Sequence, residues 1–283
     1  ACMWSGIYSK GNGCNNRLKY PRFFLDTEYE LWHILEKEGY NLNVYMRNAD
    51  SEIGMLPEGF QKYIKGGIID DYLDDLIIDD RSFTFFYLHD LHSYLDNYGY
   101  TPRQFKKGIK IIAGLIKKIF RKFDADMFDY ILIFSDHGFR YEGVRQQHLI
   151  DEDRVKTIMF MRKKGESNLE INKELRSNLD VFPTILDMIG VEVHKTIEGK
   201  TLLGKGHDYV LIEDHDDFSV RLSQSIEHWA VFTPDNKYWL ECSGEWDMFR
   251  KDEEFDRLGF ERIIKEKMND YSVNRKLWDA LHT

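Results

Sequence analysis

An aspartate and a histidine stand side by side at the end of a strongly apolar run. Residues 130–134 read Tyr-Ile-Leu-Ile-Phe, and Ser135, Asp136, His137 and Gly138 come next. Carboxylate oxygen and imidazole nitrogen are common protein ligands of divalent cations. A following glycine allows a tight turn beside an ion. The pattern predicts that Asp136 and His137 bind a metal, although this dipeptide taken alone also suits an ordinary polar turn.

A second apolar run ends in the same kinds of side chain. Residues 83–89 read Phe-Thr-Phe-Phe-Tyr-Leu-His, and Asp90 and His92 follow closely. In open α/β sheets, ligands bind in the crevice at the carboxyl ends of the strands. Two strands that both end in aspartate and histidine therefore suggest one shared crevice.

The elements that must position these side chains are strands joined by helices. Residues 130–134 have the continuous apolar character of a buried strand, which is typical of a central position in a parallel sheet. Residues 103–123 carry apolar side chains at spacings of three and four, with lysines and arginines mostly on the other faces. We predict that this basic amphipathic helix is the crossover between the two strands, with its lysines in solvent.

The N-terminal third repeats the alternation of helix and strand. Residues 27–39 predict a helix with a capping box at its start and a glycine at its end. Residues 41–46 predict a strand, and Arg47 lies just past its end. The acidic residues 48–81 predict a solvated helix-and-loop insert, and residues 157–161 predict a later strand.

The C-terminal third predicts antiparallel strands. Residues 209–213, 229–233 and 237–242 are short apolar runs, and Pro234 begins the tight turn between the last two. Residues 180–189, which precede them, predict a helix with a proline near its first turn.

Together these elements predict an α/β fold with a doubly wound, mostly parallel sheet, helices on both faces and a small C-terminal antiparallel subdomain. We expect the α/β domain over residues 1–206 and the subdomain over residues 207–283. His207, Asp214 and His215 lie around a charged strand of the smaller part. We expect these three side chains to be solvated rather than to hold a second metal.

Composition limits the classes of function. The 283 residues include 39 Lys and Arg against 49 Asp and Glu, which gives a net charge of −10. Basic residues dominate only one helix, so nucleic-acid binding is disfavoured. No apolar run has the length of a transmembrane helix. The three cysteines form no metal spacing and no disulfide framework, and their odd number favours a reducing compartment such as the cytoplasm.

Several segments, in this order, resemble the sulfatase-like branch of the alkaline phosphatase superfamily. SDHG at 135–138 looks like the motif that supplies two metal ligands, and YLHDLHSY at 87–94 resembles the segment on the substrate side. The other similar segments are TEYELWHILEKEGYNL (27–42), DVFPTILDMIGV (180–191), EGKTLLG (198–204), WAVFTPDNKYWLE (229–241) and WDMFRKDEEFDRL (246–258). The resemblance is specific because all of these segments occur in this order, and no single segment would be sufficient.

The resemblance implies roles for five residues. One divalent cation (Ca²⁺, Mg²⁺, Mn²⁺ or Zn²⁺) is expected on Asp136 and His137, where it polarises a sulfuryl or phosphoryl oxygen. His92 is expected to contact a substrate oxygen or to protonate the leaving group. His148 lies where the family places a lysine or histidine that faces the substrate. Arg47 takes the place of a family lysine and could grip an anionic oxygen with two N–H groups.

Two features depart from the family pattern. Ala49 stands where the family has a histidine, which puts sulfatase activity in doubt and leaves room for a divergent member. ACMWSGIYSKGNG at 1–13 resembles the segment that follows the family's nucleophile. We therefore expect the nucleophile, a first strand, an aspartate pair and any targeting segment to lie upstream of Ala1. On these grounds we expect the printed chain to be inactive by itself.

The predicted function is metal-dependent hydrolysis of sulfate or phosphate esters, with a glycan or another small anionic ester as substrate. One alternative within the superfamily is a phosphodiesterase or a phospho-alcohol transferase. The other is a non-catalytic member that binds an anionic ligand. The sequence predicts no oligomeric state.

Overall fold

The computed structural model describes residues 2–7, 30–47, 62–138, 152–195, 197–215, 227–234, 237–241 and 246–248. The chain divides into two compact units. Unit 1 contains residues 1–30, 148–150 and 171–283, and unit 2 contains residues 31–147 and 151–170. Each unit has strands and helices of its own.

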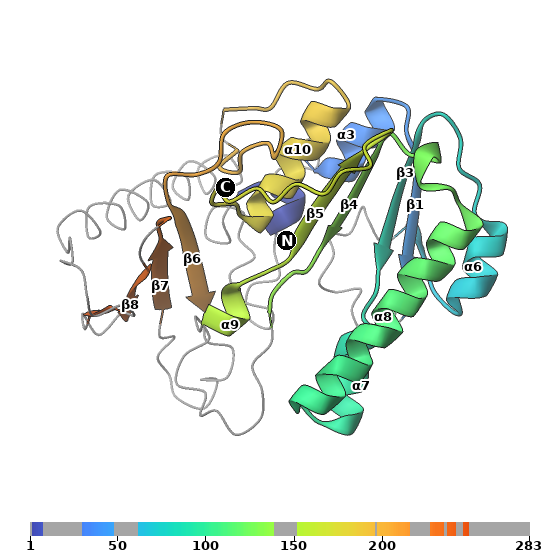
Figure 1. The fold of residues 1–283 in the computed structure, drawn as a ribbon. Coiled ribbons are helices and arrows are strands. Elements are labelled where there is room, and N and C mark those ends of the chain that lie inside the picture. Colours follow the sequence, from blue (N-terminus) through green and yellow to red (C-terminus); the bar gives the residue numbers. More distant parts are fainter. Residues whose placement is uncertain are drawn as a thin grey trace, which may run out of the picture. The chain divides into compact units, whose positions relative to one another are not determined.

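Unit 2 contains a parallel sheet in the order β2-β1-β3 (Figure 1). The strands are β1 (Asn41–Met46), β2 (Ile64–Lys65) and β3 (Ser82–Tyr87). The register pairs Met46 with Tyr87, so β1 and β3 end side by side. The strands predicted at 41–46 and 83–89 are confirmed, and the second ends two residues earlier than expected.

The strand before Asp136 pairs in a way that the sequence did not predict. β4 (Tyr130–Phe134) and β5 (Met159–Lys163) form an antiparallel pair, and the short α9 (Glu152–Val155) precedes β5. The prediction of a central parallel strand is therefore wrong for the pairing seen among the described residues. The apolar run fixes the burial of a strand but not the direction of its neighbour. All five residues of β4 are half-buried.

The core of unit 2 includes a helix from the acidic segment. α6 (Ile69–Asp75) buries three apolar side chains against Tyr45 of β1 and against Ile119. The prediction of a solvated insert over residues 48–81 is therefore wrong for α6. Its aspartates do face solvent, but isoleucine, tyrosine and leucine between them form an apolar face. α3 (Leu31–Lys37) likewise buries Leu31, Trp32 and Leu35.

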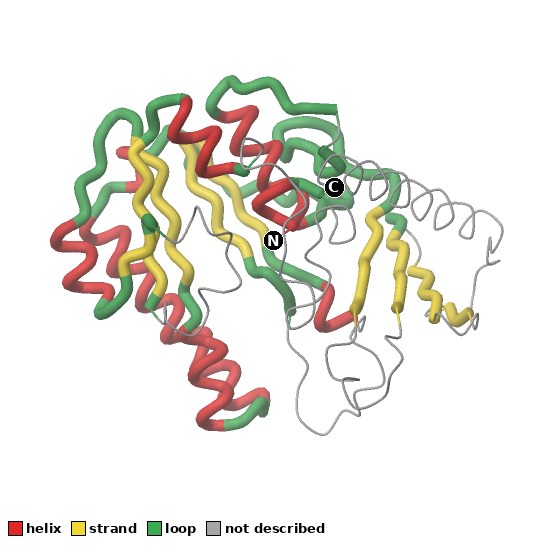
Figure 2. Tube along the Cα trace, turned by 180° about the vertical axis from the view of Figure 1, so that it is seen from behind, coloured by secondary structure: helices red, strands yellow, loops and turns green. Residues whose placement is uncertain are grey.

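Two helices of unit 2 form an antiparallel hairpin. α7 (Asp90–Tyr98) follows β3, and α8 (Pro102–Lys122) runs back beside it. Thr101 caps α8, and the proline that follows fits the first helical turn. Gly108 lets the helices approach, because a Cβ there would lie 2.4 Å from Leu91 Cδ1. Both views show the closed end of the hairpin extending beyond the ends of β1 and β3 (Figures 1 and 2).

α8 confirms the basic amphipathic helix that the sequence predicts between β3 and β4. A short 3₁₀ helix, η3 (Ala125–Met127), leads from it into β4. In Figure 1, β1, β3 and β4 run in the same direction, and the chain leaves all three at the same side of unit 2.

Unit 1 is built around a short apolar helix. α10 (Val181–Met188) follows the 3₁₀ helix η4 (Asn178–Asp180), and the six residues from Val181 to Leu186 are buried. Gly190, at a φ of +75°, ends the helix as the sequence predicts. α1 (Cys2–Ser5) lies against η4 and α10. These contacts bring the start of the described chain next to residues far along the sequence.

A four-stranded antiparallel sheet completes unit 1. Its order is β6-β7-β8-β9, formed by Val210–His215, Glu227–Phe232, Lys237–Glu241 and Trp246–Met248. The predicted antiparallel strands are confirmed. The charged sequence of residues 253–267 predicts a helix, and these residues lie outside the described part of the chain. No helix in the described part of the chain is both long and apolar enough to cross a membrane.

Candidate active site

The two predicted metal ligands lie in the turn that leaves β4. Asp136 Oδ1 accepts a hydrogen bond from the backbone N–H of His137 at 3.0 Å. His137 Nδ1 donates to the carbonyl of Gly138 at 2.7 Å, and the Gly138 N–H donates to the carbonyl of Arg154. The Asp136 and His137 side chains are 54% and 36% exposed. Both polar groups can therefore be reached by an ion from solvent.

The orientation of His137 suits a metal ligand. A carbonyl oxygen cannot donate, so Nδ1 carries the hydrogen of that contact and Nε2 is the basic nitrogen of the neutral ring. His137 Nε2 lies 3.7 Å from Asp136 Oδ2. Two ligands of one cation at metal–ligand distances of about 2.1–2.3 Å stand about 3.0–3.8 Å apart. The two atoms therefore have the spacing that one shared cation requires.

Arg47 and Asp90 join the ends of β1 and β3. The Arg47 guanidinium donates to Asp90 Oδ1. The Asp90 side chain is 4% exposed, whereas the Arg47 side chain is 57% exposed. A buried carboxylate thus holds one side of an exposed guanidinium, and a guanidinium has five N–H donors. The pair can orient Arg47 toward an anion while Asp90 remains inside.

His92 lies in the first turns of α7 and has a carboxylate partner one turn later. His92 Nε2 lies 3.1 Å from Asp96 Oδ2. The ring also stacks on His89 at a centroid distance of 4.6 Å, and His89 stacks on Tyr87 at 5.7 Å. Asp96 and the stacked rings fix the plane of His92, which is the arrangement that a positioned acid or hydrogen-bond donor needs.

Comparison with known proteins finds the fold but no relative by sequence. No protein-family model matches the chain, and no curated protein sequence matches it. BT1596, a 2-O GAG sulfatase, matches with a TM-score of 0.67 and 13% identity over 99% of this chain and 82% of its own. A protein in the alkaline phosphatase superfamily from Vibrio parahaemolyticus matches with a TM-score of 0.59 and 15% identity, over 98% and 72%. The lipoteichoic acid synthase LtaP from Listeria monocytogenes matches with a TM-score of 0.53 and 13% identity, over 99% and 78%.

The chain has a sulfatase-like fold. It is the α/β fold of the alkaline phosphatase superfamily, as the ordered segments of the sequence predict. At identities of 13–15% the likeness concerns the fold, and the chemistry must be argued from the site.

The sulfatase-like fold places four of the five predicted site residues in unit 2, after three strands that run in the same direction. Arg47 follows β1, His92 follows β3, and Asp136 and His137 follow β4. The described residues supply a carboxylate and an imidazole for a cation, but they contain no cluster of three or more metal-ligating side chains. His148 lies outside the described residues.

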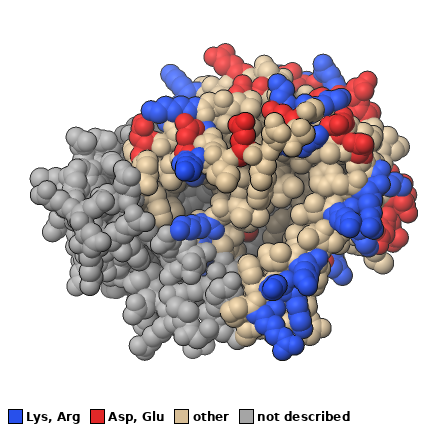
Figure 3. Space-filling model, viewed as in Figure 1, with Lys and Arg blue, Asp and Glu red and all other residues tan. Residues whose placement is uncertain are grey.

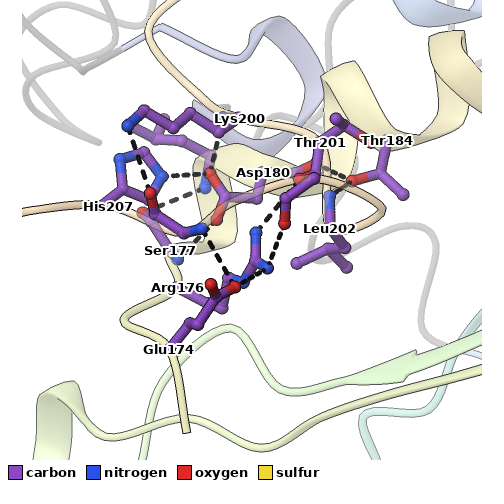
Figure 4. A network of polar contacts seen from close by, with 12 residues as sticks. Glu174, Arg176, Ser177, Asp180, Thr184, Lys200, Thr201, Leu202 and His207 are labelled. Carbon is purple, nitrogen blue, oxygen red and sulfur yellow. Dashed lines mark hydrogen bonds and ion pairs between the residues drawn. The ribbon is translucent and has the colours of Figure 1, made fainter. Parts of the chain in front are cut away.

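A second aspartate–histidine pair in this chain was not predicted as a pair from the sequence. Asp180 is fully buried at the start of α10, and its Oδ1 lies 2.7 Å from Nε2 of His207. The same carboxylate accepts backbone hydrogen bonds from Lys200 at 2.8 Å and from Ser177 at 2.9 Å (Figure 4). The expectation that His207 is solvated is wrong, since its side chain is 11% exposed.

The surroundings of Asp180 form a closed network. Thr184 Oγ donates to the carbonyl of Asp180 and accepts from the N–H of Leu202. Arg176 donates to the carbonyls of Thr201 and Gly204 (Figure 4). The network ties the loop after α10 to the start of that helix, so Asp180 and His207 stabilise the fold of unit 1. Their separation in sequence gives no local signal for the pair, although the capping pattern at Ser177 and the resembling segment 180–191 both mark Asp180 by itself.

A buried carboxyl group before α3 is a further feature that the sequence does not reveal. Glu30 is 5% exposed, and its Oε2 has no hydrogen-bond partner among the residues that the structure describes. Burial raises the pKa of Glu30 to about 7. The sequence suggests a capping role for this residue, but α3 begins after it, at Leu31.

Proposed function

We propose that the protein is a metal-dependent hydrolase of sulfuric or phosphoric esters, with a glycan ester or another small anionic ester as substrate. The observation that carries the proposal is the turn after β4. There an exposed carboxylate and the basic nitrogen of an imidazole stand 3.7 Å apart, the spacing of two ligands on one cation. The sulfatase-like fold supports this reading.

Each residue has a proposed task. Asp136 and His137 hold one divalent cation, which when bound withdraws charge from an ester oxygen. Arg47, held by Asp90, binds a non-bridging oxygen of the anionic group. His92, oriented by Asp96, donates a hydrogen bond or a proton to the leaving oxygen. His148 is proposed to face the substrate from its loop.

The finer features of the fold belong to the same proposal. We propose a doubly wound, mostly parallel sheet with helices on both faces, and a boundary between residues 206 and 207. The described antiparallel sheet β6–β9 supports a distinct C-terminal part. A reducing compartment remains a proposal that rests on the three cysteines.

A sulfated glycan is the substrate class that we favour. The similar structure BT1596 is a 2-O GAG sulfatase, which supports a glycan ester. The similar structure LtaP is a lipoteichoic acid synthase, which keeps phospho-group transfer as the second candidate. The third candidate, a member that only binds an anionic ligand, is motivated by Ala49 in place of a family histidine.

The deciding experiment measures bound metal and turnover on the full-length natural protein. Metal content is determined by elemental analysis for the wild type, for Asp136→Ala and for Asp129→Ala. Asp129 is an exposed aspartate at the opposite end of β4 and serves as the matched control. Turnover is measured with an aryl sulfate, an aryl phosphate and a bis-aryl phosphate.

The proposal expects about one cation per chain in the wild type and in Asp129→Ala, and its loss in Asp136→Ala together with turnover. The identity of the ester that is cleaved shows whether the enzyme acts on sulfate or on phosphate esters. A wild-type protein with neither metal nor turnover would refute the enzyme and leave the anion-binding alternative.

A further inference from the structure

α8 concentrates positive charge in an acidic protein. The chain carries a net charge of −10, yet the helix from Pro102 to Lys122 contains eight lysines and arginines and no acidic residue. Figure 3 shows one group of blue side chains over the hairpin end of α8 and a second group beside red ones, where α8 lies next to α6. The protein as a whole repels anions, so this local charge needs its own explanation.

Only two of these eight basic side chains form an ion pair with the described part of the chain. Lys118 pairs with Asp70 at 2.6 Å, and Lys122 pairs with Asp74 at 2.8 Å. The other six basic residues of α8 are exposed and make no ion pair with the described part of the chain; they are Arg103, Lys106, Lys107, Lys110, Lys117 and Arg121. Four of these six lie in the first nine residues of the helix, at the end that α6 does not cover.

The burial of the apolar side chains of α8 argues against insertion of this helix into a membrane. α8 buries Gly108 and Ile119, and its other large apolar residues except Ile109 and Ile111 are at least half-buried in unit 2. An interfacial membrane helix instead turns a continuous apolar face toward the acyl chains. The exposed side of α8 is mainly cationic, so its partner is an anion in water.

Tyrosines stand beside the cations at the closed end of the hairpin. Tyr98, the last residue of α7, is 62% exposed and packs against Tyr94 with ring centroids 4.6 Å apart. Tyr94 donates to Gln104 of α8 at 2.9 Å, which places the rings beside the basic end of that helix. Exposed aromatic faces can stack on sugar rings, while lysine and arginine bind sulfate groups. This combination suits a charged sugar chain better than a simple ion.

The hairpin also continues from the candidate site. His92 lies near the start of α7 and Tyr98 at its end, about 9 Å away along the helix at 1.5 Å per residue. We infer that the α7–α8 hairpin binds a linear sulfated glycan whose next residues extend from the site along α7 to the basic end of α8. This inference rests on the proposed function, because it makes the substrate a polymer with repeated anionic groups.

The test is salt-dependent binding of heparin, used as a linear sulfated glycan, to the full-length protein. The variant replaces the four basic residues at the start of α8 by alanine (Arg103, Lys106, Lys107 and Lys110). The control removes four exposed lysines elsewhere and so changes the net charge equally (Lys37, Lys65, Lys164 and Lys173). Desulfated heparin and vesicles with anionic lipid are measured as competing ligands.

We expect the α8 variant to bind heparin at least tenfold more weakly at 0.1 M salt, with a shallower salt dependence, and the control to bind as the wild type does. Desulfated heparin should bind weakly, and vesicles should not compete. Equal weakening in both variants, or equally tight binding of vesicles, would overturn the inference.

The two proposals fail separately. Asp136→Ala should lose metal but retain heparin binding, and the α8 variant should retain turnover of a small aryl ester. If the wild type binds heparin through α8 without metal or turnover, the glycan surface stands and the hydrolase does not. If small esters are cleaved but heparin binding is unchanged in the α8 variant, the hydrolase stands and the surface does not.

Discussion

The molecule contains two aspartate–histidine pairs that differ in what surrounds them. Asp180 and His207 are 0% and 11% exposed, and the carboxylate receives two backbone N–H groups besides the ring. Asp136 and His137 are 54% and 36% exposed and stand in a turn. The same two residue types are therefore buried in a hydrogen-bonded network in unit 1 and exposed to solvent in unit 2.

The difference follows from the cost of burying charge. A buried carboxylate is stable only when other groups replace its lost water, and the oxygens of Asp180 are bonded to His207 and to two backbone N–H groups. An exposed carboxylate keeps its water until a cation displaces it. Residue type alone therefore does not distinguish a stabilising pair from a candidate ligand pair, whereas burial and hydrogen bonding do.

The largest effect is expected where the buried pair is broken. Asp180→Ala removes the acceptor of the Ser177 and Lys200 N–H groups and leaves His207 without its carboxylate. We expect a loss of about 3–5 kcal/mol in the free energy of unfolding, measured by urea denaturation. The control is Asp187→Ala, which removes an exposed carboxylate bonded to Thr201, with a loss under about 1 kcal/mol. Equal losses would show that the network is not a stabilising unit.

The loop that closes the Asp180 network is tested by a single methyl group. A Cβ at Gly199 would lie 2.2 Å from the backbone oxygen of Leu179, so the loop must shift. Gly199→Ala should cost about 1–3 kcal/mol of stability by thermal or urea unfolding. Gly204→Ala is the control, because its nearest contact is Thr201 Cγ2 at 3.4 Å. Unchanged stability in Gly199→Ala would mean that the loop is not packed as described.

The contribution of Glu30 to stability is expected to depend on pH. Burial raises its pKa to about 7, so the protonated form is the one that the fold favours. Its stabilising contribution is present below the usual carboxyl pKa and is lost as the pH rises through 7, where the buried group ionises. The substitution Glu30→Gln should therefore be more stabilising at pH 8 than at pH 5. The difference between its two effects on the free energy of unfolding should be roughly 1–3 kcal/mol.

The control for Glu30 is Glu38→Gln, which changes an exposed carboxyl in the turn after α3. It should show no comparable difference between the two pH values. A Glu30→Gln effect that is the same at pH 5 and pH 8 contradicts the burial of a carboxyl group at this position.

The smallest effect on stability is expected at the exposed pair, Asp136 and His137. Asp136→Asn keeps the size of the side chain, and the exposed amide oxygen can still accept the His137 N–H. The free energy of unfolding, measured with metal chelated, should change by less than about 0.5 kcal/mol. Bound metal should nevertheless be lost. A loss of stability near that of Asp180→Ala would show that Asp136 is a structural residue, and the two pairs would then not differ in role.

Local pattern was sufficient for several parts of the molecule. The apolar run before Asp136, the period of α8 and the glycine after α10 predict elements whose bounds differ from the observed ones by at most one residue. These predictions succeed because hydrogen bonding within a helix, and alternation or continuity in a strand, depend on neighbours in the chain. The sulfatase-like fold was predicted from the resemblance of the ordered segments to a known family, and the pattern of elements predicted only an α/β fold.

Local pattern failed where the outcome depended on a partner. The aspartates between the apolar residues of α6 suggested a solvated insert, but Tyr45 and Ile119 cover its apolar face. The run at β4 suggested a parallel strand, but its described partner is the antiparallel β5. Neither neighbour is encoded in the segment itself.

The amino-acid sequence by itself determined which residues could do chemistry and at which strand ends they stand. The tertiary structure alone decided two contacts. Arg47 donates to Asp90, 43 residues away, and His207 forms a hydrogen bond with Asp180, 27 residues away. Such contacts depend on the path of the chain through space, which periodicity does not describe. Because that path also sets burial, it decides that Asp180 lies inside a hydrogen-bonded network while Asp136 is exposed to solvent.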